Sequence, residues 1–312
     1  MVGYSPNSEY HLTGSQLGIA GATSGAVSRA LTQPLDVLKI RFQLQVEPTA
    51  GRETAKSKYR GVLQATRLVV KEEGVNALWK GHIPAQGLSL LYGASQFYTY
   101  ELLTHYACDL KFNPAAFWVH FTCGALSGCS ACFITNPLDV VRTRLIAQGE
   151  PKIYSGMTSA FTAIARKEGL LAFYKGLTPS LILIAPQIGA VFACYEFFHD
   201  AWCSTLPNAT GWAPLICGAM AGVCSKTLVY PLDLAKKRLQ VTGFEHARKS
   251  FGEVVVYRGL GHVLWRTATK EGLHGLFKGV WPSVLKAAFT TGLQLAVYEQ
   301  TCHMLVLMAH HH

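Results

Sequence analysis

Three acid–base sets recur along the chain in one pattern. Each set follows a proline, with an aspartate two residues after it and a lysine or arginine three residues later: Pro34, Asp36 and Lys39; Pro137, Asp139 and Arg142; Pro231, Asp233 and Lys236. Residues three apart lie on one face of a helix, so each set offers both charges to neighbouring helices. An enzyme would need its charged site once, whereas this threefold repetition favours a symmetrical set of ionic contacts. The alternative is that these charges only end helices at a membrane interface.

The repetition extends to both sides of these sets. A GxxxG glycine pair stands thirteen and nine residues before each proline, and such pairs allow helices to approach closely in lipid. After each proline comes a Glu-Gly pair and then an aromatic-Lys-Gly triplet, as in Glu73-Gly74 and Trp79-Lys80-Gly81. The sequence therefore predicts three repeats, over residues 1–110, 111–206 and 207–309. We interpret residues 310–312 as the remnant of a tag.

The composition is that of a membrane protein. Of the 312 residues, 50% are hydrophobic and only 15% are charged, with a mean hydropathy of +0.21. This balance argues against a soluble enzyme and against a nucleic-acid-binding protein. The net charge of +10 is spread among apolar stretches and so favours an anionic solute or a lipid surface as partner. The nine cysteines lie mostly in apolar segments, and we expect neither a disulfide framework nor a metal site.

Each repeat predicts a long apolar helix kinked at its proline, a short amphipathic helix that ends near the Glu-Gly pair, and a second long apolar helix. The six long helices are expected at residues 15–46, 82–106, 117–148, 177–203, 212–242 and 280–305. Such lengths exceed the roughly 30 Å of a hydrocarbon core. An even number of spans places both termini on one side. The first thirteen residues hold no Lys or Arg, so they match neither a secretory nor a transit leader.

The triplicated Pro-x-Asp-x-x-Lys/Arg-x-Lys/Arg motif, with its Glu-Gly and aromatic-Lys-Gly companions, resembles the mitochondrial carrier family over essentially the whole chain. The resemblance implies six tilted transmembrane helices in three pseudo-threefold repeats, each with a short amphipathic matrix helix. It also implies a monomeric, multi-pass protein of the mitochondrial inner membrane. The termini would face the intermembrane space, and a solute would cross by alternating access.

In this threefold arrangement the acid–base sets form a matrix gate. We pair Asp36 with Arg142, Asp139 with Lys236, and Asp233 with Lys39. Such pairs are breakable because desolvation offsets most of their attraction. By resemblance, glutamines nine residues after each proline brace the pairs, which gives Gln43 and Gln240, but Ile146 stands at the third place. We therefore expect two braces.

A cytoplasmic gate is implied at the other end, where the family has an aromatic residue, an acid and then a base. The aromatic–acid pairs are present as Tyr100 and Glu101, Tyr195 and Glu196, and Tyr298 and Glu299. No lysine or arginine stands at the expected places: Thr104 and Cys302 occupy two of them, and the third holds His199, a base that is neutral over part of the physiological pH range. This gate should therefore be weak.

The solute site is expected between the gates. Arg29 and Lys226 stand five residues before their motif prolines, and Lys286 stands at a family contact position, so three cations would face the cavity without a matching acid. Arginine and lysine suit a pyrophosphate group. The remaining candidates are an apolar wall and hydrogen-bonding partners: Leu88, Leu183, Ile184, Gln187, Tyr92, Gln96 and Gln294. Each of these polar side chains could equally join helices to one another.

Stretches of the third repeat around Lys226 to Arg248 are similar to members of the family that carry thiamine pyrophosphate. The resemblance implies import of thiamine pyrophosphate in exchange for nucleotides or thiamine monophosphate. A nucleotide or coenzyme A carrier would use the same basic cavity and stays open as an alternative. No cofactor is expected, although cardiolipin could bind at helix N-termini after the Lys-Gly motifs. A membrane-embedded enzyme and a proton or anion leak pathway are the other classes considered.

Overall fold

A computed structural model describes residues 14–47, 57–110, 116–149, 152–205, 213–244 and 255–310. Within these residues the protein is entirely helical, with ten α-helices and short 3₁₀ turns. The first thirteen residues and His311 and His312 of the expected tag remnant lie outside the described residues.

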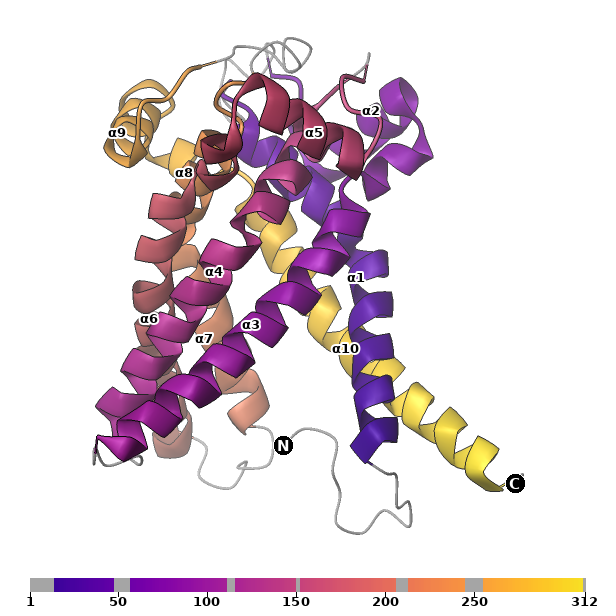
Figure 1. Cartoon of the computed structure of the whole chain (residues 1–312), viewed down its shortest axis with the longest axis vertical. Coiled ribbons are helices and arrows are strands. Elements are labelled where there is room, and N and C mark those ends of the chain that lie inside the picture. The colour runs from indigo at the N-terminus through magenta and orange to yellow at the C-terminus, as the bar shows by residue number, and fades with distance from the viewer. Residues whose placement is uncertain are drawn as a thin grey trace.

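The long helices form an open bundle (Figure 1). They are α1 (Gly14–Leu44), α3 (His82–Asp109), α4 (Phe117–Ala147), α6 (Leu177–Thr205), α7 (Ala213–Leu228) with α8 (Tyr230–Gln240), and α10 (Val280–His310). Their ends converge beside the short helices α2 (Val62–Glu73), α5 (Met157–Lys167) and α9 (Leu260–Lys270) and diverge at the other end (Figure 1). We call these the short-helix end and the open end. The first turn of α1 and the last turn of α10 both lie at the open end, as an even number of crossings requires.

The long helix expected over 212–242, kinked at its proline, is present as α7 and α8, with an interruption at Val229, two residues before Pro231. Pro34 and Pro137 lie inside unbroken helices. Two residues before each of these prolines, Thr32 and Thr135 donate hydrogen bonds to carbonyls one turn earlier, at 2.8 and 2.7 Å. These hydroxyls do not reach the carbonyls that the prolines leave without a helical donor, which lie four residues before each proline. In the first repeat that carbonyl belongs to Ala30, and Trp79 Nε1 donates to it at 3.0 Å. Among the three described proline motifs, only the third has its helix interrupted beside the proline.

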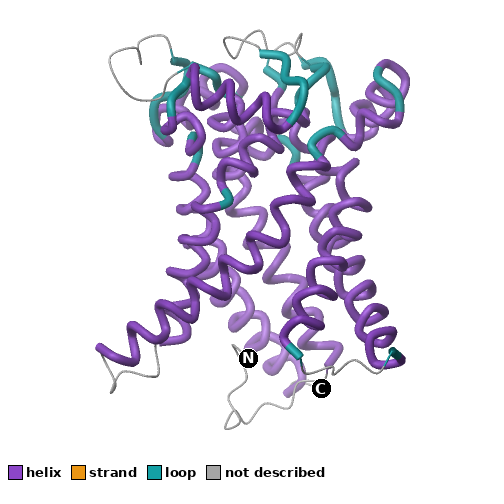
Figure 2. The backbone as a smooth tube through the Cα atoms, turned by 90° about the vertical axis from the view of Figure 1, so that its left-hand side faces the viewer, coloured by secondary structure: helices purple, strands orange, loops and turns teal. Residues whose placement is uncertain are grey.

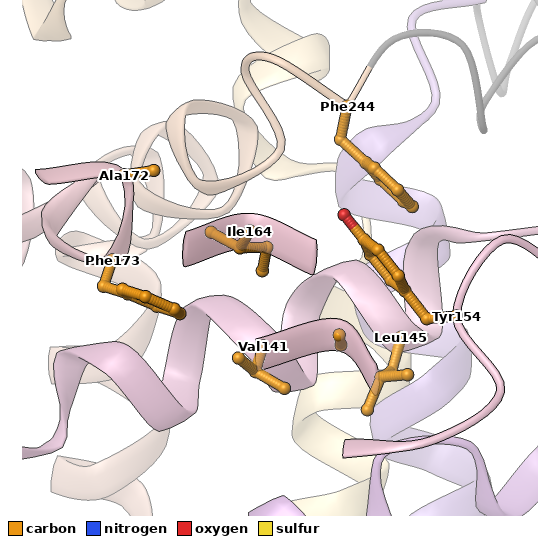
Figure 3. Close-up of a cluster of buried hydrophobic side chains, with 8 residues drawn as sticks. Val141, Leu145, Tyr154, Ile164, Ala172, Phe173 and Phe244 are labelled. Carbon is orange, nitrogen blue, oxygen red and sulfur yellow. The ribbon is translucent and has the colours of Figure 1, made fainter. Parts of the chain in front are cut away.

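Most of the tightly packed apolar side chains lie at the short-helix end. In the second repeat α5 packs on α4 through Val141, Leu145, Ile164 and their neighbours, and the rings of Tyr154 and Phe244 stack with centroids 4.9 Å apart (Figure 3). Another cluster joins all three repeats and consists of Val37, Ile40, Leu44, Ile146, Ala147 and Val241. Most of the described loops also gather at this end (Figure 2). The bundle is thus sealed at the short-helix end.

Length and hydropathy alone single out one helical run among the described residues as able to cross a membrane. This run is Leu170–Thr205, with a hydropathy of 1.7, and Ile216–Leu228 is a shorter apolar helix. The other long helices carry charged and polar side chains, yet many large apolar side chains on them are exposed, such as Phe97, Trp118 and Phe289 at 78%, 72% and 55%. An outward apolar surface of this kind is suited to lipid.

Candidate functional site

The structure joins the acid–base sets in the predicted cross-repeat pairs. Lys39 Nζ lies 2.6 Å from Asp233 Oδ2, Arg142 Nη2 lies 2.6 Å from Asp36 Oδ2, and Lys236 Nζ lies 2.9 Å from Asp139 Oδ2. Each pair connects two repeats, so the three pairs close a ring of charges across the bundle. Asp36 and Asp139 are buried, which reduces their screening by water.

The two predicted glutamines contact these pairs. Gln43 donates from Nε2 to Asp233 Oδ2 at 3.2 Å, and Gln240 donates to Asp139 Oδ2 at 2.8 Å. Ile146, at the third place, instead joins the apolar cluster between the repeats and lies against Gly81. The Asp36–Arg142 pair therefore has no glutamine at this position.

Two further lysines reach the ring. Lys286 Nζ lies 2.7 Å from both carboxylate oxygens of Asp36. Lys286 was expected to face the cavity with no acid at the matching sequence positions, and here its ammonium group also contacts an acid of the ring, on another helix. Lys237 Nζ lies 2.8 Å from Asp139 Oδ1, and the sequence analysis did not single it out. The only feature of the sequence that pointed to Lys237 was the run of three basic residues Lys236-Lys237-Arg238.

A pocket lies directly over the ring, with a volume of about 240 Å³. Of the predicted solute-site residues, Leu88, Tyr92 and Lys286 line it, together with the acids and bases of the ring. Cys132 also lines it, with Thr135 and Asn136 nearby. The pocket thus combines an apolar and aromatic side with several cations.

The other predicted solute-site residues do not line this pocket. Arg29 is half-buried on α1 and donates from Nη1 to the Ala85 carbonyl at 3.4 Å. Lys226 is exposed on α7, and within the described residues it makes no hydrogen bond or ion pair. Ile184 packs where a side chain on Gly128 would stand, so this GxxxG glycine does allow α4 and α6 to approach closely. The remaining candidates Leu183, Gln187 and Gln96 are half-buried, and Gln294 is exposed.

At the open end the described residues show no ion pair within the predicted cytoplasmic gate. Glu101, Glu196 and Glu299 are exposed, and the described part of the chain gives none of them an ion pair. Their aromatic neighbours have other contacts: the Tyr100 hydroxyl lies 2.7 Å from His120 Nδ1, and Tyr195 stacks on His199. Tyr298 is half-buried. The structure therefore has one closed ring of charges and an open opposite end.

The model for the mitochondrial carrier protein family matches residues 11–110, 113–205 and 207–308. The chain belongs to the mitochondrial carrier family. It is 47% identical over 310 residues to the mitochondrial thiamine pyrophosphate carrier of Homo sapiens, with 97% of each chain covered. It is 48% identical to the protein of the same name from Bos taurus, again with 97% of each covered. The mitochondrial thiamine diphosphate carrier 1 of Zea mays is 37% identical, over 90% of this chain and 91% of that protein.

Membership makes this chain a transporter rather than an enzyme, and a multi-pass protein of the mitochondrial inner membrane.

In this mitochondrial carrier the short helices are held by a second set of charges, which was not predicted from the sequence. Arg41 donates to both carboxylate oxygens of Glu73, at 2.6 and 2.7 Å, and Lys80 Nζ lies 2.5 Å from Glu73. Arg144, Glu168 and Lys175 repeat the arrangement, as do Arg238, Glu271 and Lys278. The sequence feature that pointed to these contacts was the fixed spacing between the Glu-Gly and Lys-Gly pairs of each repeat.

Two of these glutamates, Glu73 and Glu168, are held in the ionised form. Burial opposes the charge of Glu73, but the hydrogen bonds and charges of Arg41 and Lys80 outweigh it, so its pKa is lowered from the usual 4.5. Burial also opposes the charge of Glu168, and Arg144 and Lys175 again bring the pKa below the usual value. The short helices α2 and α5 are therefore each tied to the end of a long helix by an ion pair that persists at neutral pH.

Proposed function

We propose that this carrier imports thiamine pyrophosphate into the mitochondrial matrix by alternating access. The observation that carries the proposal is the similarity along 97% of the chain to animal proteins named mitochondrial thiamine pyrophosphate carriers. Nucleotides or thiamine monophosphate would leave the matrix in exchange, which would return the carrier to the state that is open to the intermembrane space.

The chemistry of the pocket supports this substrate class. Pyrophosphate oxygens form strong, charge-assisted hydrogen bonds with lysine and arginine. Lys286 lines the pocket, and Arg29 and Lys226 stand on the long helices α1 and α7. Leu88 and Tyr92 offer an apolar and aromatic side to the rings of thiamine, since aromatic faces attract a cationic ring such as thiazolium.

The two ends of the bundle take the roles of gates in this proposal. The ring of Asp36, Asp139, Asp233 and their bases is the matrix gate, closed in this structure, and the short-helix end faces the matrix. The open end, with both ends of the described chain, faces the intermembrane space. Tyr100 and Glu101, Tyr195 and Glu196, and Tyr298 and Glu299 would approach one another when the carrier opens to the matrix. The chain acts as a monomer, without nucleic acid.

Uptake of labelled thiamine pyrophosphate into liposomes that hold the purified protein tests the proposal. The liposomes are loaded with thiamine pyrophosphate, with a nucleotide, with coenzyme A or with buffer. We expect rapid uptake against internal thiamine pyrophosphate, and loss of uptake in Lys226→Met. Exchange of nucleotides or coenzyme A without any exchange of thiamine pyrophosphate would show that the substrate is wrong while the family stands.

A further inference from the structure

The Asp36–Arg142 pair differs from the other two pairs of the ring. By the rotation that relates the repeats, Gln43 contacts Asp233 and Gln240 contacts Asp139, so residue 146 should contact Asp36. An isoleucine stands there and makes no polar contact. Without a further contact, Asp36 would have Arg142 as its only partner.

Lys286 takes the place of that missing glutamine, but from the opposite side. It contacts both oxygens of Asp36 at 2.7 Å, and 27% of its side chain is exposed, against 7% for Asp36. The equivalent positions in the first two repeats hold Leu88 and Leu183, which cannot make such a contact. All the cations of the ring border the pocket, but Lys286 is the most exposed of them, at 27% against 21% for Lys236 and 12% for Lys39, so a ligand reaches it most readily.

We propose that Lys286 is a positioning residue that couples ligand binding to the Asp36–Arg142 pair: an anionic phosphate in the pocket competes with Asp36 for Lys286. Its transfer from carboxylate to phosphate leaves Asp36 with Arg142 alone. The ring is then weakest at this pair, and the short-helix end separates first between the first and second repeats. The inference rests on the proposed function for the identity of the ligand, but the contact itself requires only an anion.

The coupling must act in both directions. If phosphate binding draws Lys286 away from Asp36, then the Asp36 carboxylate lowers the affinity of the pocket for phosphate by the same free energy. A ligand without phosphate cannot make the exchange, so thiamine alone would leave the ring closed. This makes Asp36 and Lys286 together responsible for the requirement that the solute be phosphorylated.

Hydrogen–deuterium exchange followed by mass spectrometry tests the coupling. The peptides to follow cover 36–45, 139–148 and 233–241, which carry the ring and the apolar cluster beneath it. Wild-type protein is compared with Lys286→Met, Lys286→Arg and Lys226→Met, each without ligand and with thiamine, inorganic pyrophosphate or thiamine pyrophosphate. Lys286→Met should raise ligand-free exchange in 36–45 and 139–148 by about tenfold, the scale of one lost charge-assisted hydrogen bond.

The other variants separate coupling from a general loss of charge. Lys286→Arg should keep the slow ligand-free exchange. Lys226→Met removes a cation that has no hydrogen bond or ion pair with the described residues of the ring, so it should also keep the slow ligand-free exchange while weakening ligand binding. Adding Ile146→Gln to Lys286→Met supplies the missing glutamine, so it should restore slow ligand-free exchange but not the response to pyrophosphate.

The result that overturns the inference is ligand-free exchange in Lys286→Met equal to that of the wild type, or a full response to pyrophosphate in that variant. Both of these outcomes are measured without ligand or with inorganic pyrophosphate, so they do not depend on which solute the carrier transports. If pyrophosphate speeds exchange in the wild type and thiamine pyrophosphate neither binds nor speeds it, the proposed function fails while the coupling stands.

Discussion

Gln240 and Gln43 occupy equivalent places but have unequal roles in the ring. Gln240 donates to Asp139 and accepts hydrogen bonds from Thr143 Oγ1 at 2.7 Å and from Lys237 Nζ at 3.0 Å. Gln43 makes the one longer contact with Asp233. The difference arises because Lys237 and Thr143 provide extra donors on the side of Asp139, whereas no equivalent donor to Gln43 is present among the described residues.

We predict that Gln240→Leu lowers the stability of the closed carrier by about 2 kcal/mol, because it leaves buried partners unpaired. Gln43→Leu is the matched control and should cost only about 1 kcal/mol. The measurement is the apparent Tm of the purified proteins in detergent. Equal shifts for the two variants would mean that the additional contacts of Gln240 contribute nothing.

At the scale of elements, the short helices depend on their buried glutamates. The amphipathic helix α2 ends at Glu73, whose side chain is only 2% exposed and is held by bases from α1 and from the turn before α3. Removing one partner of a buried ion pair is costly because the other charge stays buried. The neighbouring Glu72 is 41% exposed and pairs with Lys58, so its pair should be worth little.

Stability should therefore fall in acid. The pKa of Glu73 and that of Glu168 are lowered by folding, so their contribution is complete above 4.5, the usual pKa, and is lost as the pH falls through the still lower folded values. Glu73→Gln should cost about 3 kcal/mol at pH 7 and reduce the loss on acidification. Glu72→Gln should leave both the stability at pH 7 and its loss on acidification unchanged. Apparent Tm recorded from pH 7 to pH 3 measures this, and an acid loss as steep in Glu73→Gln as in the wild type would contradict it.

At the scale of the whole molecule, the two ends are unequal. Three closed pairs and two extra lysines hold the short-helix end, while the acids at the open end have no lysine or arginine at the expected positions. Thr104 is one of these positions, and its hydroxyl donates to the Tyr100 carbonyl of its own helix. A ligand or a mutation shifts such an equilibrium only by favouring one state over the other.

Thr104→Lys supplies a base that the threefold order of the ring would direct toward Glu299. We expect it to stabilise closure of the open end and so to increase hydrogen–deuterium exchange at 36–45, 139–148 and 233–241. Thr104→Met, of similar length without the charge, is the control. No difference between the two variants would show that the missing bases do not set the balance between the ends.

Repetition made most of this architecture predictable. The proline motifs gave the three repeats and the pairing order, and the glutamine spacing located both braces and the exception at Ile146. The spacing did not reveal contacts that break the threefold symmetry. Lys286 reaches Asp36 from a position that holds Leu88 and Leu183 in the other repeats, and Lys237 reaches Asp139 from one that holds Ile40 and Thr143. The interruption at Val229 likewise belongs to the third repeat alone, although all three repeats carry the same proline motif.

The central claim is that cross-repeat ion pairs gate the transport of thiamine pyrophosphate. Lys39 and Asp233 test it most directly, because Asp233 is the acid of the ring that contacts a single cation in the described structure. The measurement is exchange of labelled thiamine pyrophosphate by liposomes holding the wild type, Lys39→Asp, Asp233→Lys or the double exchange of both charges.

We predict exchange by the wild type, loss of most of it in each single variant, and substantial recovery in the double variant, since a restored pair of opposite charge can again close the gate. A double variant no more active than the single ones would contradict the pairing as the basis of the gate, and absence of exchange by the wild type would contradict the substrate.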